Sequence, residues 1–240
     1  MAPVGVLGRP SGDPSYGREL GSVIWLIAVA GLVAGPVIGA LLRIAMLLLR
    51  LVSPGSSGLL SDDGFEIGVV TLAGTYNLVM LGVGLGLLGA SAYVLVAPFL
   101  VGRRWFRRLT VALTAMFLGG ATTIHDDGVD FNLLDPEAAV ALFLLVPLVS
   151  GVVVVVAVDA LDRRVSSPTW APVGLVLFPV ALVLGLVLAA LAAVLLPLRR
   201  MALEPILARA PARWLVRLAF AATPVLALVW TIRQSRLVLE

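Results

Sequence analysis

The sequence predicts an all-α protein, a polytopic transmembrane helical bundle with about six spans. Of its 240 residues, 60% are hydrophobic and 13% charged, and the mean hydropathy is +1.09. A soluble domain carries roughly 25% charged residues, so these polar residues are too few to cover a surface in water. The apolar residues also form long runs, and about 20 such residues suffice for one membrane crossing. The chain is therefore expected to lie in lipid.

The first predicted span covers residues 23–51. Residues 1–20 have no apolar periodicity and are expected to form a solvated tail, which leaves 21–240 as a single transmembrane domain. The first apolar run follows this polar tail and is too long for a signal sequence. At ~1.5 Å per residue it exceeds the ~30 Å hydrocarbon layer. We therefore expect a tilted helix, with a kink at Pro36.

Further apolar runs predict the remaining spans, at residues 74–101, 109–124, 138–160, 173–198 and 214–232. The run at 109–124 is short, and Arg217 lies near the start of the last one. Five or four spans are therefore alternatives, and a re-entrant 173–198 segment, which contains Pro179, is another.

Arginine placement predicts a cytoplasmic N-terminus, because short loops rich in arginine stay in the cytoplasm. With six spans, ten of the 17 basic residues fall inside: Arg9, Arg18, Arg103, Arg104, Arg107, Arg108, Arg163, Arg164, Arg233 and Arg236. The stretch 199–217 weakens this bias, and it would return to the inside if the segment at 173–198 were re-entrant.

Missing residue types exclude several kinds of chemistry. The chain has no cysteine and no lysine, and His125 is its single histidine. Thiol catalysis, disulfides, thiolate metal sites and lysine Schiff bases are thus excluded, as is a haem held by two histidines of this chain. The Gly84–Gly89 stretch fits a nucleotide-binding glycine motif, but it lies inside a span and lacks the required acidic residue. No cofactor is predicted, although a divalent cation could bind.

Acidic residues gather in two loops without arginine, at about 53–73 and 125–137. Because two predicted spans separate the loops, both are expected on the same, outer face. Each contains an Asp-Asp-Gly-apolar-acid-apolar sequence, at 62–67 and 126–131. Two similar glycine turns explain this pattern. A shared anionic site for a cation and an internal duplication are the alternatives.

His125, Asp127 and Asp130 could contribute to a metal site of mixed nitrogen and oxygen ligands. The alternative is a histidine that is only hydrogen-bonded to carboxylates. A calcium EF-hand does not fit, because Leu134 stands where its glutamate should be. The candidate residues for binding a ligand or cation are Arg43, Asp62, Asp63, Glu66, Tyr76, Asn77, His125, Asp126, Asp127 and Asp130.

Small residues at helical spacing predict close helix packing in the first two spans. They are Gly31, Gly35, Gly39, Gly82, Gly86 and Ala90. The first row continues to Arg43, whose charge we expect to be neutralised by acids of the two outer loops, together with Tyr76 or Asn77; snorkelling to headgroups is the alternative. Asp159 and Asp162 are expected to pair locally with Arg163 and Arg164.

The stretches Gly-Phe-Glu-Ile-Gly at 64–68 and Ile-His-Asp-Asp-Gly-Val-Asp-Phe at 124–131 carry a resemblance. Over about residues 60–160 the chain resembles uncharacterised multi-pass membrane proteins of GC-rich Gram-positive bacteria. The resemblance implies a location in the plasma membrane of such a bacterium. It implies no activity and no functional residues.

Three functions are compatible with these observations. The first is a non-enzymatic bundle acting as a scaffold or accessory subunit, whose partners are the lipid bilayer and partner membrane helices or further copies of the chain. The second is binding or transport of a cation or small solute through an outward acidic vestibule. The third is a membrane-embedded enzyme that uses Asp and His. Nucleic acid is excluded as a partner, because the arginines at 103–108 suit lipid headgroups better.

Overall fold

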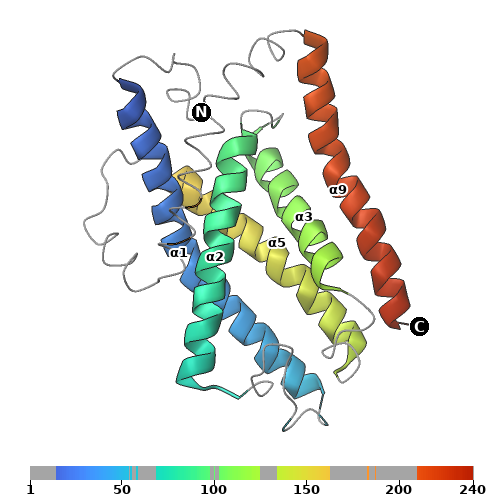
Figure 1. Ribbon diagram of the computed structural model, residues 1–240. Helices are drawn as coiled ribbons and strands as arrows, with labels where there is room; N and C mark the ends of the chain where they lie inside the picture. Colours follow the sequence, from blue (N-terminus) through green and yellow to red (C-terminus); the bar gives the residue numbers. More distant parts are fainter. Residues whose placement is uncertain are drawn as a thin grey trace.

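The regular structure of the chain is α-helical throughout the part that the computed structural model describes, which comprises residues 15–53, 69–97, 103–124, 134–162 and 210–239 with single residues at 55, 58, 100, 183 and 187. The helices are α1 (Ser15–Val52), α2 (Leu72–Val96), α3 (Arg104–Thr123), α5 (Pro136–Leu161) and α9 (Ala210–Leu239) (Figure 1). They confirm the prediction of helices for five of the apolar runs. The first fourteen residues lie outside the described residues, as does the run at 173–198 apart from residues 183 and 187.

Three of the described helical segments are long and apolar enough to cross a membrane. They are Gly21–Val52, Leu72–Val96 and Pro136–Leu161. Many side chains on the outside of the bundle are large and apolar, including Leu48, Leu85, Leu145 and Val156, each more than 40% exposed. A surface of this kind suits a hydrocarbon environment.

The closest helix contact is between α1 and α2, which run antiparallel with glycines facing the partner helix. A Cβ atom on Gly39 would lie 2.6 Å from the Cα of Val79, and one on Gly31 would lie 3.0 Å from the Cα of Leu87. A Cβ atom on Gly82 would overlap the backbone of Gly35. Since lipid tails already satisfy apolar side chains, this close backbone approach supplies the packing that holds the pair together.

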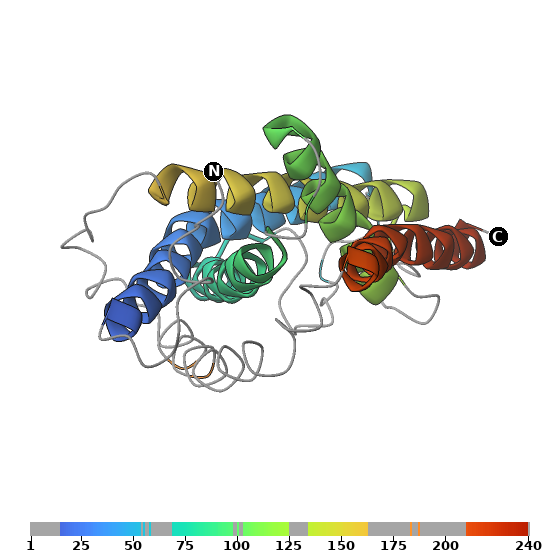
Figure 2. The same cartoon turned by 90° about the horizontal axis from the view of Figure 1, so that it is seen from above.

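Helix α5 packs against α1 on one side and against α3 on the other. Ile38 of α1 and Val155 of α5 belong to one cluster of fully buried side chains. On the other side, a Cβ atom on Gly151 would lie 3.0 Å from the Cα of Ala112, and one on Gly119 would lie 2.6 Å from the ring of Pro147. Figure 2 shows the start of α1 at one edge of the bundle and α9 at the opposite edge.

Helix α9 packs on α3 and runs parallel to it. The Thr231 hydroxyl donates a hydrogen bond to the carbonyl of Phe117, and Val238 packs against the cluster that contains Ile124. Helix α5 runs antiparallel to α3 and ends at Leu161, near the start of α3. The connection 163–209 therefore leaves α5 and enters α9 at the same end of the bundle (Figure 1). The six-span prediction is not confirmed, because residues 173–198 lie outside the described residues apart from 183 and 187.

Side-chain caps fix the starts of two helices. Thr71 caps α2, with its hydroxyl accepting a hydrogen bond of 3.0 Å from the Gly74 amide. Asp135 caps α5 in the same way through the Ala138 amide, and Pro136 fills the first helical position. An aspartate followed by proline is a strong signal for a helix start. Asp135, one of the acids of the loop at 125–137, therefore has a structural role.

Candidate functional site

An apolar groove of about 850 Å³ lies between α2 and α3. Helices α1 and α5 form its floor, and Thr223 of α9 touches its edge. The walls are mostly apolar, and include Leu85 and Leu88 on α2 and Leu118 on α3. Along α3 the groove extends from Thr110 to Thr123, about 20 Å at ~1.5 Å per residue.

Threonine hydroxyls in the groove donate hydrogen bonds to their own helix. Thr114 donates to the Thr110 carbonyl at 2.8 Å, and Thr122 donates to the Leu118 carbonyl at 2.9 Å. Thr123 donates to the Gly119 carbonyl at 2.7 Å. Because these donors are already used, the threonines contribute little polarity to the groove. The lining of the groove is therefore mostly apolar, although it includes the Ser150 hydroxyl, which is buried without a hydrogen-bond partner.

One end of the groove meets a polar cluster of Tyr93, Arg108 and Asp159. The Tyr93 hydroxyl donates to Asp159 Oδ1 at 2.9 Å. Arg108 donates to Asp159 Oδ2 from Nε at 3.0 Å and from Nη2 at 2.8 Å. The Asp159 side chain is 16% exposed, so these charge-assisted bonds are partly shielded from solvent. The cluster links α2, α3 and α5 at one end of the bundle.

The structure shows a partner of Asp159 that the sequence did not predict. Its partner is Arg108, 51 residues away on another helix, whereas Arg163 and Arg164 lie outside the described residues. Sequence spacing favours neighbours, and it misses a partner that only the antiparallel packing of α3 and α5 brings close. Burial raises the pKa of the Asp162 carboxyl above its ordinary value, and the nearby Asp159 charge raises it further.

The described ends of the two acidic loops lie at the other end of the bundle. Ser53, directly after α1, accepts a hydrogen bond of 2.8 Å from the amide of Asp135. Leu49, Ile124 and Leu134 share one buried cluster nearby. Both loops therefore leave and rejoin the bundle at this end. The candidate acids and histidine, Asp62, Asp63, Glu66, His125, Asp126, Asp127 and Asp130, lie outside the described residues.

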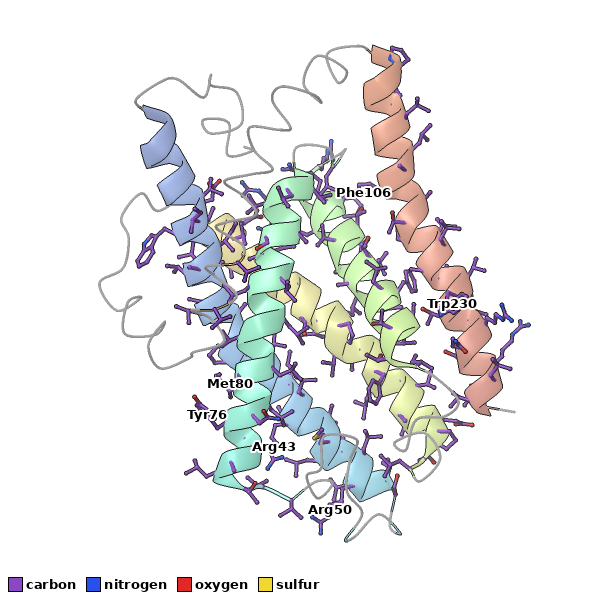
Figure 3. The ribbon with its side chains drawn as sticks, viewed as in Figure 1. Arg43, Arg50, Tyr76, Met80, Phe106 and Trp230 are labelled. Atoms are coloured by element: carbon purple, nitrogen blue, oxygen red, sulfur yellow. The ribbon has the colours of Figure 1, made fainter. Side chains whose placement is uncertain are left out.

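Arg43 is buried in the same half of the bundle, at 8% exposure (Figure 3). Its Nη2 atom donates a hydrogen bond of 2.6 Å to the Val69 carbonyl just before α2, while its Nε atom is buried without a hydrogen-bond partner. The guanidinium is thus held inside the fold, which argues against snorkelling to headgroups. Tyr76 and Asn77 are both exposed on α2. The loop acids expected to pair with Arg43 lie outside the described residues, so this pairing stays a prediction.

Metal ligands are not gathered anywhere in the described helices and their ends, where no group of three His, Asp or Glu side chains could hold an ion. Comparison with protein-family models, with curated proteins and with solved structures finds no match for the chain. The resemblance to uncharacterised multi-pass membrane proteins of GC-rich Gram-positive bacteria thus stays a prediction.

Proposed function

We propose that the protein is a non-catalytic binding protein of a bacterial plasma membrane, a lipid-embedded scaffold around a hydrocarbon ligand held in the apolar groove. The observation that carries this proposal is the groove of about 850 Å³, lined by aliphatic side chains from several helices. In a bilayer such a space is filled with hydrocarbon, because an empty one would leave its lining atoms without dispersion partners. An acyl chain from the surrounding lipid is the simplest occupant of the groove.

The length of the groove suits an acyl chain. The groove is about 20 Å long, which is comparable to the hydrocarbon of one leaflet at about 15 Å. Lipid chains are flexible and can follow its walls.

The proposed topology has five crossings and a cytoplasmic N-terminus, with residues 173–198 entering and leaving the membrane on the same side. The direction of α9 supports it, because α9 begins at the end where α5 finishes. In this arrangement thirteen of the 17 arginines face the cytoplasm. Only Arg43, Arg50, Arg233 and Arg236 belong to the outer half, a stronger inward bias than six spans would give.

Lipid retention tests the proposed ligand. The full chain is extracted from phospholipid vesicles with a mild detergent, and the lipid bound to it is counted by native mass spectrometry. Leu88 lines the groove and is 48% exposed, so Leu88→Trp should fill the space and reduce retention. Leu95 is 46% exposed on the same helix but outside the groove, so Leu95→Trp should retain lipid like the wild type.

Two outcomes would overturn the proposal. Equal retention by both tryptophan variants would show that the bound lipid lies elsewhere on the surface. No retained lipid in the wild type, together with destabilisation by Leu88→Trp, would show that another part of the same chain fills the groove.

A second candidate function is cation binding at the end that carries the acidic loops. The Ser53–Asp135 hydrogen bond supports it, since it joins the start of one loop to the end of the other. Divalent ions should then raise the melting temperature of the purified protein, and Asp126→Asn with Asp127→Asn should abolish the rise. No response to any ion of a broad panel would remove this candidate.

A further inference from the structure

The face of α3 that lines the groove continues into arginine toward the start of the helix. Val111 and Leu118 line the groove. Arg107 precedes Val111 by four residues and Arg104 by seven, so both arginines lie on the same helical face. Side chains on a helix lean toward its N-terminus, which carries both guanidinium groups beyond the apolar walls. The hydrocarbon groove therefore ends at a cationic mouth.

The positive charge at this mouth is only partly compensated by the described residues. Arg108 is paired with Asp159, whereas the Nε atom of Arg107 is buried without a hydrogen-bond partner. Arg104 is exposed. The first turn of α3 holds no acidic residue, and the capping residue Arg103 makes no side-chain hydrogen bond to it. Cations are unfavourable at a helix N-terminus and anions are favourable, so the local electrostatics favour a bound anion.

Aromatic residues indicate the level of this mouth in the membrane. Trp105 and Phe106 are both exposed, and their rings meet edge to face with centroids 5.7 Å apart. Tryptophan is enriched where hydrocarbon meets headgroups. Arg104 and Arg107 flank these two rings in the sequence, so we expect both arginines near the depth of the lipid phosphates.

We infer that the occupant of the groove is an anionic phospholipid, whose phosphate is bound by Arg104 and Arg107 and whose acyl chain extends along the groove between α2 and α3. The inference rests on the proposed hydrocarbon groove and adds the chemical class of the headgroup. A zwitterionic headgroup carries its own cation, which the arginines of this end repel. A headgroup with net negative charge has no such penalty.

The test uses the full chain reconstituted in vesicles of equal parts phosphatidylglycerol and phosphatidylcholine. After mild extraction, native mass spectrometry measures the ratio of the two lipids that remain bound. We expect enrichment of phosphatidylglycerol in the wild type. Arg104→Gln with Arg107→Gln should reduce this enrichment about fivefold for each arginine removed.

Matched variants separate the site from general charge effects. Arg233→Gln with Arg236→Gln removes the same charge near the end of α9, at the opposite end of the bundle from the start of α3 (Figure 1), and should leave the enrichment unchanged. Arg104→Lys with Arg107→Lys keeps the positive charge and should preserve most of the phosphatidylglycerol enrichment. Equal retention of both lipids by the wild type would overturn the inference, as would an equal loss in both glutamine pairs. If Leu88→Trp still lowers total retention in that case, the hydrocarbon groove stands and only the headgroup assignment fails.

Discussion

Asp159 is the side chain through which three of the described helices are tied together. It receives hydrogen bonds from Tyr93 of α2 and from Arg108 of α3, and it belongs to α5. Because the carboxylate is largely buried, its loss leaves the guanidinium of Arg108 without its only described counter-charge. Unpaired, partly buried charges are costly, so the cluster stabilises the end of the bundle where the groove opens.

Asp159→Asn should lower the free energy of unfolding by about 1–3 kcal/mol, the range for hydrogen bonds to charged groups. Tyr93→Phe removes one neutral donor and should cost about 1 kcal/mol. Both values can be measured by denaturant titration in detergent. A double-mutant cycle with Arg108→Gln should give a coupling energy of similar size, and a coupling near zero would contradict the pairing.

Asp162 gives the same end of the bundle a pH dependence. Its pKa is raised by burial and by the Asp159 charge, so the folded state holds this proton more tightly than the unfolded chain does. The associated stability is present below about pH 4, the ordinary range of an aspartate, and is lost as pH rises through the raised pKa. Asp162→Asn should therefore gain stability relative to the wild type as pH increases to neutrality. The prediction would be contradicted if the melting temperatures of the two proteins changed by the same amount between acidic and neutral pH.

At the level of helices, the α1–α2 contact is set by glycine rather than by large side chains. A Cβ atom on Gly35 would overlap the Cα atom of Val83, so even alanine must push the two helices apart. Overpacking of this kind costs about 1–3 kcal/mol. Gly35→Ala should accordingly lower the melting temperature of the purified protein.

Gly21→Ala provides the matched control on the same helix, since nothing lies within 4 Å of the added Cβ atom. It should have little effect, or a slightly favourable one through helix propensity. Equal effects of the two substitutions would mean that close packing at Gly35 does not contribute to stability.

For the whole molecule, accessibility of single cysteines tests the proposed topology. The natural chain has no cysteine, so labelling of a variant with one introduced cysteine measures the accessibility of that position. Gly55→Cys follows α1 at the outer end, and Ser235→Cys lies in the last turns of α9. With five crossings, both should react with a membrane-impermeant thiol reagent added to intact cells, whereas Arg103→Cys should not. A six-span chain would protect Ser235→Cys.

The sequence predicts the positions of the described helices well, because hydrocarbon demands long apolar runs and the ends of those runs are marked by charge. The run predicted at 74–101 corresponds to a helix at Leu72–Val96, and the run at 138–160 to Pro136–Leu161. Sequence reasoning missed the groove, because it exists only where α2 and α3 fail to meet over α1 and α5. Asp159 shows the same limit, since its partner depends on helix pairing rather than on spacing.

The glycine contact between α1 and α2 has a consequence for biosynthesis. The two helices are consecutive in the chain and meet over most of α2, so they can pair as soon as the ribosome has released them, before α3 and α5 exist. One wall of the groove is then complete while its other side is still open to the bilayer. Lipid tails already lying against α2 would be enclosed when the later helices are added, so the proposed lipid would enter during synthesis without a separate loading step.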